Sequence, residues 1–124
     1  LAGVVGRARV ALVSPQWDEP YGLVAAEAMA CGTPVAAFAR GALDEVVGVE
    51  AGRLARPDDV DDLARAAREA SALDRAAVRA HAVRHCSLDR MVRRYEDLYR
   101  RAGAPSPSST VPSGVGTTGL ETPP

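Results

Sequence analysis

The sequence predicts an α/β fold, part of a Rossmann-like domain in which a few parallel strands alternate with flanking helices. The short apolar run at residues 9–14 has the length and flanking turn residues of a buried strand, the run at 35–38 predicts a second strand, and residues 52–55 predict a short edge strand. The segments between and after them have helical periodicity, and this alternation favours a parallel sheet. Three strands are few for a stable sheet, so we expect that part of the domain lies upstream of Leu1.

The first half of the chain predicts a strand, a loop and a helix in that order. The strand at 9–14 ends at Pro15, and residues 16–21 form a loop because prolines at both ends disfavour regular structure. Residues 22–31 are rich in Ala, Leu, Met and Glu and predict a helix, which ends at Gly32 as its C-terminal cap.

The second half is predicted to be mainly helical. A short helix is expected at 43–47, and residues 74–85 predict a longer one. Before it, a helix that follows Pro57 is expected to bury Val60, Leu63, Ala64, Ala67 and Ala70. A last helix begins after Ser87 as N-cap, with an apolar face made of Leu88, Met91, Val92, Tyr95, Leu98 and Tyr99.

Composition limits the domain organisation and the classes of partner. Residues 1–103 predict a single domain, whereas residues 104–124 are rich in Pro, Ser, Thr and Gly, have little to bury and predict a disordered tail. The net charge of −1 means that the chain lacks the overall positive charge that attracts nucleic acid. No apolar run is long enough to predict a transmembrane segment. Cys31 and Cys86 are interpreted as buried thiols, and we expect a cytoplasmic protein, with peripheral membrane association as the alternative.

The stretch "DEPYGLVAAEAMACGTP" at residues 18–34 is the strongest functional signal in the chain. It places a helix N-terminus just beyond the carboxyl end of a strand, which is where open α/β sheets bind ligands. The free N–H groups and partial positive charge of a first helical turn favour a phosphate. Gly22 lets a ligand approach the backbone, and Glu19 can project a carboxylate beside the same place.

Glu27 is the only ionisable residue between Gly22 and Thr33. It follows Leu23 by one helical turn, so we expect it on an apolar stripe of the helix. An unpaired buried carboxylate costs on the order of several kcal/mol, and hydroxyl donors of a sugar or ribose would satisfy it. A helix-surface glutamate is the alternative, as a solvated loop acid is for Glu19.

The longer segment "SPQWDEPYGLVAAEAMACGTPVAAFARGALDEVV" resembles the nucleotide-sugar signature of family 4 glycosyltransferases, which are retaining enzymes of the GT-B fold. Their mark is two glutamates separated by seven residues, with E-P-F-G-L at the first and E-A-M-A-C-G-T-P-V from the second. Glu19 and Glu27 keep that spacing, and Tyr21 replaces the usual Phe. The resemblance continues through "AGRLARPDDVDDLARA" and "SLDRMVRRYEDLYRR" and covers about residues 1–101.

The resemblance implies a division of roles within one donor site. Glu19 would be the catalytic-site carboxylate that binds hydroxyls of the donor sugar, and the amides of Tyr21 and Gly22 would hold the same sugar. The amides of Leu23 and Val24 would face the diphosphate. Glu27 would bind the ribose hydroxyls of the nucleotide.

The resemblance also implies a function for the whole enzyme. It would transfer a sugar from a nucleoside-diphosphate sugar to an unknown acceptor with retention of configuration, and it would need no metal or other cofactor. The Arg and Lys pair that usually stabilises the leaving diphosphate would lie upstream of Leu1, in the part of the donor domain that precedes this C-terminal half. In GT-B proteins the last helix often crosses to the N-terminal domain, so we expect the apolar face of residues 87–101 to lack its partner here.

Other functions remain open at this point. A non-catalytic or truncated GT-B remnant and a GT-B nucleotide-sugar epimerase are the main rivals, and a two-carboxylate glycoside hydrolase is a weaker one because a helix N-terminus suits a phosphate. Glu45 either supports the donor loop or only begins a short helix. Gly41 fits a glycine of the family, but Arg40 stands where many relatives have a second glycine. His81, His85 and Cys86 have a spacing that could bind metal, but we interpret them as helix surface.

Overall fold

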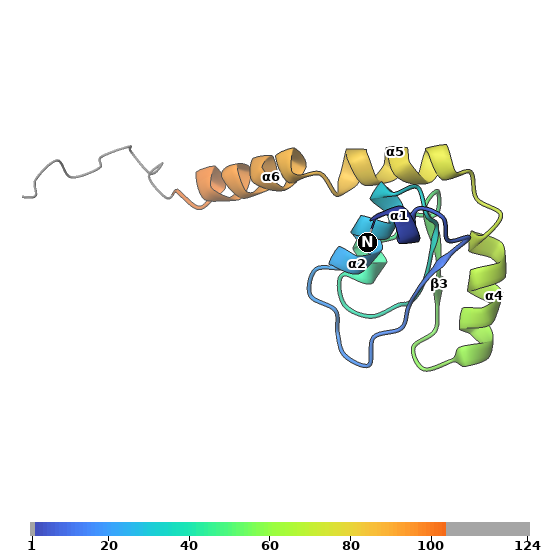
Figure 1. Ribbon diagram of the computed structural model, residues 1–124. Helices are drawn as coiled ribbons and strands as arrows, with labels where there is room; N and C mark the ends of the chain where they lie inside the picture. The colour runs from blue at the N-terminus through green and yellow to red at the C-terminus, as the bar shows by residue number, and fades with distance from the viewer. Residues whose placement is uncertain (1, 104–124) are drawn as a thin grey trace, which may run out of the picture.

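A three-stranded parallel sheet forms the centre of the protein in a computed structural model that describes residues 2–103 (Figure 1). The strands β1 (Ala11–Val13), β2 (Val35–Phe38) and β3 (Gly52–Ala55) are adjacent in that order. Both pairs are parallel, and every residue of the central strand β2 is buried. The predicted α/β fold with a few parallel strands and flanking helices is therefore confirmed. The predicted tail at 104–124 lies outside the described residues.

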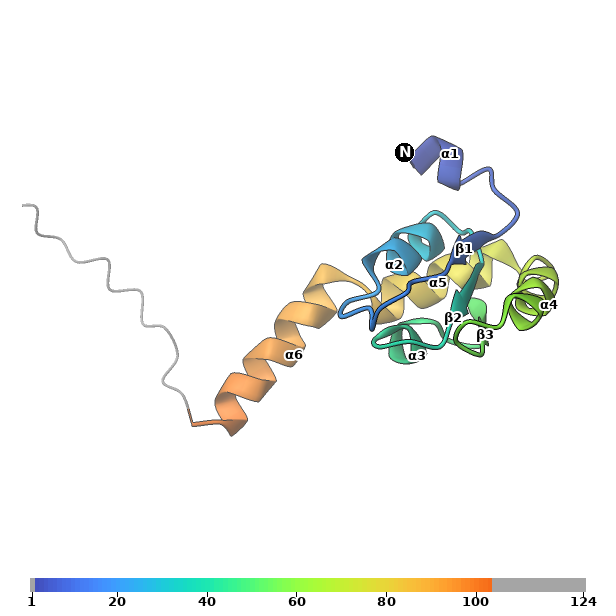
Figure 2. The same ribbon diagram turned by 90° about the horizontal axis from the view of Figure 1, so that it is seen from below.

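Helices cover both faces of the sheet (Figure 2). On one face α2 (Leu23–Ala30) packs beside α5 (Arg75–His85), and on the other α4 (Val60–Ala70) packs on β2 and β3. Two short helices, α1 (Ala2–Val5) and α3 (Leu43–Val46), lie at the N-terminal end and between β2 and β3.

The central strand divides the core into two clusters, because successive side chains of a strand point to opposite faces. The larger cluster contains Ala25, Ala28, Met29, Val35, Ala37, Leu43, Val47, Ala51, Val78 and Ala82. The smaller one contains Ala36, Phe38, Ala55, Ala66 and Ala70. Most of these side chains are alanines, so the helices lie close to the sheet. β1 pairs only with β2 among the described residues, so its other side is an open edge.

Helix α4 forms where it was predicted, but its buried face is different. Asp59 caps the helix by accepting a hydrogen bond from the amide of Asp62. Val60 and Ala64 were expected in the core but are exposed, whereas Ala66 is fully buried. Small residues dominate the segment, so the periodicity of apolar residues did not define which side faces the sheet.

Helix α5 shows that one prediction about the histidines is wrong, because His81 is buried and does not lie on the surface. Its Nε2 is 3.1 Å from the carbonyl oxygen of Val46, and its Nδ1 is 3.1 Å from a carboxylate oxygen of Glu50. His81 therefore joins α5 to the segment between β2 and β3. His85 is exposed, as predicted. Partial burial of the neighbouring Cys86 raises the pKa of its thiol, and both cysteines are free and half-buried.

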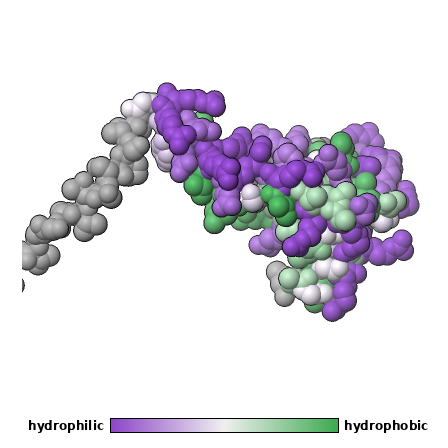
Figure 3. Space-filling view, turned by 90° about the horizontal axis from the view of Figure 1, so that it is seen from above, coloured by the Kyte–Doolittle hydropathy of each residue, from purple (hydrophilic) through white to green (hydrophobic). Residues whose placement is uncertain are grey.

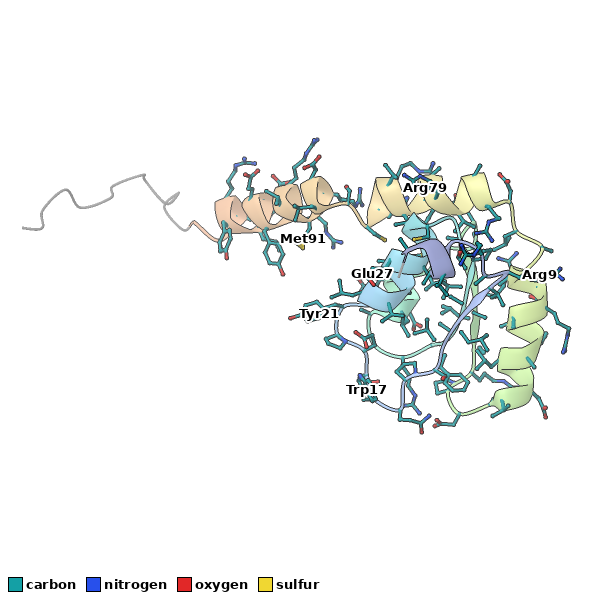
Figure 4. The ribbon with its side chains drawn as sticks, viewed as in Figure 1. Arg9, Trp17, Tyr21, Glu27, Arg79 and Met91 are labelled. Carbon is teal, nitrogen blue, oxygen red and sulfur yellow. The ribbon has the colours of Figure 1, made fainter. Side chains whose placement is uncertain are left out.

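Helix α6 (Leu88–Arg101) extends away from the sheet, as Figure 1 shows. Ser87 caps it, as predicted, by accepting a hydrogen bond from the amide of Arg90. Its apolar face has no partner among the described residues: Leu88, Met91, Val92, Tyr95, Leu98 and Tyr99 are between 44% and 68% exposed. Figure 4 shows Met91 on the lower side of the helix, with many charged groups on the upper side. From above, that upper side is mostly hydrophilic (Figure 3).

Candidate functional site

The loop between β1 and α2 holds Glu19 in a defined orientation. Its Oε1 accepts hydrogen bonds from the amide of Gly22 at 3.2 Å and, more weakly, from the amide of Tyr21 at 3.4 Å. Gly22 has a left-handed backbone with a φ of 66°, which places these amides beside the carboxylate at little steric cost. No described residue donates a hydrogen bond to the other oxygen, Oε2, so this atom can accept one from a ligand.

The N-terminus of α2 differs from those of the longer helices. A side chain caps each of α4, α5 and α6, from Asp59, Asp74 and Ser87, but α2 begins at Gly22 without a side-chain cap. Within residues 2–103 nothing accepts a hydrogen bond from the amides of Leu23 and Val24. The first turn of α2 therefore presents free donors and the positive end of the helix dipole.

A hollow of about 260 Å³ lies beside this helix N-terminus. Its wall combines the end of β1, the loop and the start of α2, and it contains the residues Leu12, Val13, Ser14, Pro15, Trp17, Glu19, Gly22, Val24 and Ala25. Most of the lining is apolar, with the carboxylate of Glu19 as its one charged group. It opens at the carboxyl end of a parallel strand, where α/β proteins bind their ligands.

The loop that follows β2 supports Glu19 from behind. The amide of Ala42 donates to the backbone carbonyl of Glu19 at 2.7 Å. A Cβ atom at Gly41 would lie 2.4 Å from that carbonyl oxygen and 2.6 Å from the Glu19 nitrogen. Gly41, which also has a positive φ of 57°, thus lets the two loops touch. The side chain of Arg40 forms an ion pair with Asp58.

Glu27 lies on the exposed side of α2, away from the sheet (Figure 4). Leu23 and Ala30, which share its stripe, are exposed too, and the buried stripe is instead formed by Ala25, Ala28 and Met29. The expectation that Glu27 carries a desolvation cost on an apolar helix face is therefore wrong. The helix is apolar all round, and only one side of it meets the sheet.

Three of the six residues that were predicted to form the site line the hollow, namely Glu19, Gly22 and Val24. Leu23 and Glu27 are not among its lining residues, and the side chain of Tyr21 points outward (Figure 4). Sequence reasoning did not select Ser14 or Trp17 as lining residues. Trp17 is the only tryptophan of the chain and lies two residues before Glu19. Its closeness to the predicted site residue could have identified it as a lining residue.

Two further observations concern metals and membranes. The described residues bring no three His, Cys, Asp or Glu side chains into a group that could hold a metal ion. Within residues 2–103 no helix has both the length and the apolar composition to cross a membrane.

Residues 2–82, which include the whole site, match the family described as "Glycosyl transferases group 1". This chain belongs to that family. The match covers the sheet, the loop with Glu19 and the helix with Glu27, so the resemblance to glycosyltransferases is confirmed.

Individual relatives agree with this assignment. The MMP alpha-(1->4)-mannosyltransferase of Mycolicibacterium hassiacum is 49% identical over 65 residues, which are 51% of this chain and 16% of that protein. Sucrose-phosphate synthase from Thermosynechococcus elongatus has a similar structure, with a TM-score of 0.66 and 35% identity over 82% of this chain and 27% of that one. AviGT4, a glycosyltransferase involved in avilamycin A biosynthesis, has a TM-score of 0.63 and 29% identity over 83% of this chain and 33% of its own. The chain therefore spans a third or less of the length of each relative.

Proposed function

We propose that this chain forms half of the donor site of a glycosyltransferase that takes a sugar from a nucleoside-diphosphate sugar. The observation that carries the proposal is the uncapped N-terminus of α2 beside the oriented carboxylate of Glu19. One end of this arrangement suits a diphosphate, and the other suits sugar hydroxyl groups. Membership of the glycosyl transferase group 1 family supports the same class of reaction.

Glu19 is proposed to bind the donor sugar through Oε2. Because two backbone amides already hold Oε1, the second oxygen has a fixed direction and accepts hydrogen bonds from sugar hydroxyls without losing side-chain entropy. The amides of Tyr21 and Gly22 were predicted to hold the sugar as well. In this arrangement they act mainly through Glu19, and they bind sugar directly only if the carboxylate moves.

The amides of Leu23 and Val24 are proposed to bind the diphosphate. A leaving diphosphate gains negative charge as the bond to the sugar breaks, and fixed N–H dipoles stabilise that charge in the transition state. A cationic pair from the upstream part of the protein would complete this side of the site. The open edge of β1 gives an upstream strand a place to pair and would bring that part close.

Glu27 is proposed to bind the two ribose hydroxyls of the nucleotide. It lies five residues beyond Gly22, which is about 7.5 Å along a helix. This separation places it past the phosphates when they sit at the first turn. Its exposure in this structure leaves the carboxylate free to accept both hydrogen bonds.

Retention of configuration, membership of family 4 and a reaction without metal are further parts of the proposal. They rest on the pair of glutamates and its spacing. Proton NMR of the first product formed would show the anomeric configuration directly. The acceptor binds outside the part of the chain described, and α6 is proposed to pack its apolar face on the N-terminal domain that supplies the acceptor site.

Donor turnover by the full-length protein tests the site. Glu19→Ala and Glu27→Ala should each lower kcat/KM for the nucleotide sugar by about 10- to 100-fold, the loss expected for hydrogen bonds to a charged group. Asp18→Ala is the matched control, because Asp18 is an exposed acid next to Glu19 and outside the motif. Unchanged turnover in both glutamate variants would refute the site assignment.

The products separate the remaining alternatives. Transfer of the sugar to an acceptor supports the glycosyltransferase, whereas release of an epimerised sugar would identify an epimerase. Absence of nucleotide-sugar binding by the full-length protein would indicate a non-catalytic remnant.

A further inference from the structure

Trp17 is the most unusual side chain of the hollow, because it is 63% exposed although tryptophans are highly buried on average. It lies on the loop between β1 and α2 (Figure 4). Glu19 follows two residues later, and both residues line the hollow. None of the described residues accepts a hydrogen bond from its indole N–H. A large flat apolar surface is thus left open next to an oriented carboxylate.

The loop around Trp17 restricts its movement. Pro15 is buried and Pro20 follows Glu19, so proline rings fix two φ angles in a six-residue segment. On the far side, Gly41 and Ala42 pack on the backbone of Glu19. An aromatic ring presented by a constrained loop loses little conformational entropy when a ligand binds to it.

The chemistry of the lining fits a pyranose ring. A sugar has hydroxyl groups around its edge and C–H groups on its faces, so it needs hydrogen-bond acceptors and a flat apolar surface together. Glu19 and Ser14 supply oxygen atoms, and the indole supplies the surface. The volume of about 260 Å³ is below the roughly 300–1,000 Å³ of pockets that enclose a drug-sized ligand, which suits a single ring.

We propose that Trp17 is a stacking platform for the hexose of the nucleotide sugar and determines which sugar is accepted. The ring lies with one face on the indole while Glu19 binds hydroxyls at its edge. This inference rests on the proposed donor site and extends it from the nucleotide class to the sugar. A hexose with an axial hydroxyl on the stacked face would lose contact with the indole, so Trp17 discriminates between epimers.

Kinetics of the full-length protein test the proposal with pairs of donors that share a base and differ only in the sugar epimer, UDP-glucose with UDP-galactose and GDP-glucose with GDP-mannose. Trp17→Ala should lower kcat/KM for the better donor by roughly 5- to 50-fold, from lost aromatic contact. Trp17→Phe, which keeps a flat ring, should stay within about threefold of the parent. Inhibition by UDP or GDP alone should be unchanged in both variants, because neither contains a hexose. Val49→Ala, an exposed apolar loop residue outside the hollow, is the matched control.

Fluorescence of the full-length protein gives a second readout, in which the signal of Trp17 is the difference in emission between the parent and Trp17→Phe. Nucleotide sugar should change this difference, and the nucleoside diphosphate alone should change it much less. Equal changes with both ligands would overturn the proposal by placing Trp17 beside the nucleotide.

The remaining outcomes are also decisive. Unchanged kinetics in Trp17→Ala would overturn the platform and leave the donor site standing. A lower melting temperature with unchanged KM would show that Trp17 packs against another part of the protein and would overturn it too. If the parent binds none of UDP, GDP, ADP and dTDP, the donor site itself is wrong, and the platform falls with it.

Discussion

Helices α4 and α6 have the same local design but opposite surroundings. Each begins at a side-chain cap, has at least one acidic residue in its first turn and at least one arginine in its last, and is amphipathic. The buried face of α4 is made of alanines that lie against β2 and β3, whereas α6 has Leu, Met, Val and Tyr on a face that nothing in the described chain covers. Local sequence therefore determines that a helix forms, and the rest of the fold determines whether its apolar face is buried.

The size of the apolar residues also differs between the two helices. Ala66 and Ala70 allow α4 to lie close to a flat sheet. The longer side chains of α6 need a surface with depressions, such as the grooves of other helices. This difference is consistent with a partner for α6 that is helical and lies outside residues 2–103.

The largest expected effect comes from placing a charge on each face. Ala66→Glu in the 124-residue chain should destabilise it by about 3 kcal/mol or more, because it overpacks a fully buried position and buries a carboxylate. The matched change Leu98→Glu on α6 should alter the free energy of unfolding by less than about 0.5 kcal/mol. Urea unfolding followed by circular dichroism measures both, and equal destabilisation would show that α6 is buried after all.

The exposed face of α6 should make the 124-residue chain bind hydrophobic dyes or self-associate. The double variant Met91→Lys and Leu98→Glu should reduce dye fluorescence severalfold without unfolding the chain. A monomer that unfolds cooperatively and binds no dye would contradict the assignment of α6 as a docking helix.

Removal of the helix cap should lower the free energy of global unfolding by about 1 kcal/mol for α4 and leave it unchanged for α6. Asp59→Ala removes the cap of α4 and should lower the midpoint of global unfolding, because α4 is part of the core. Ser87→Ala should reduce helicity at 222 nm and leave that midpoint unchanged, because the apolar face of α6 packs on no other described element. A shift of the midpoint in both variants would show that α6 unfolds together with the core.

The smallest effect concerns pH at the start of α4. A hydrogen bond from the Arg56 amide, followed by one from the Arg65 side chain, lowers the pKa of Asp62 below its usual 3.8. A carboxyl group with a lowered pKa stabilises the fold above the unfolded value and loses this contribution as pH falls through the folded value. Asp62→Asn should therefore make stability depend less on pH below about pH 4. Asp97→Asn, at an exposed ion pair of α6, is the control and should not change that dependence.

Sequence reasoning predicted the elements well because their signals are local. The strands at 35–38 and 52–55 and the N-cap Ser87 are where they were expected, and the first strand is shorter than predicted at both ends. These features depend on residues within a few positions of one another, such as apolar runs, prolines and hydroxyl caps.

Burial was harder to predict because it depends on distant residues. His81 is buried by contacts to Val46 and Glu50, more than thirty positions earlier. Glu27 could not be assigned to the exposed side of α2, because both sides of that helix are apolar. The contact of Gly41 with Glu19 likewise joins two loops that only the folded sheet brings together.

That contact has a consequence for how the family can vary. Position 41 has no room for any side chain while Glu19 keeps its place, since the added atom would overlap the glutamate backbone. The contact is with backbone atoms, so it depends on the path of the loop and not on which residue stands at 19. Position 41 should therefore stay glycine wherever the loop around residue 19 keeps this path, and a larger residue there should mark relatives in which one of the two loops has another shape.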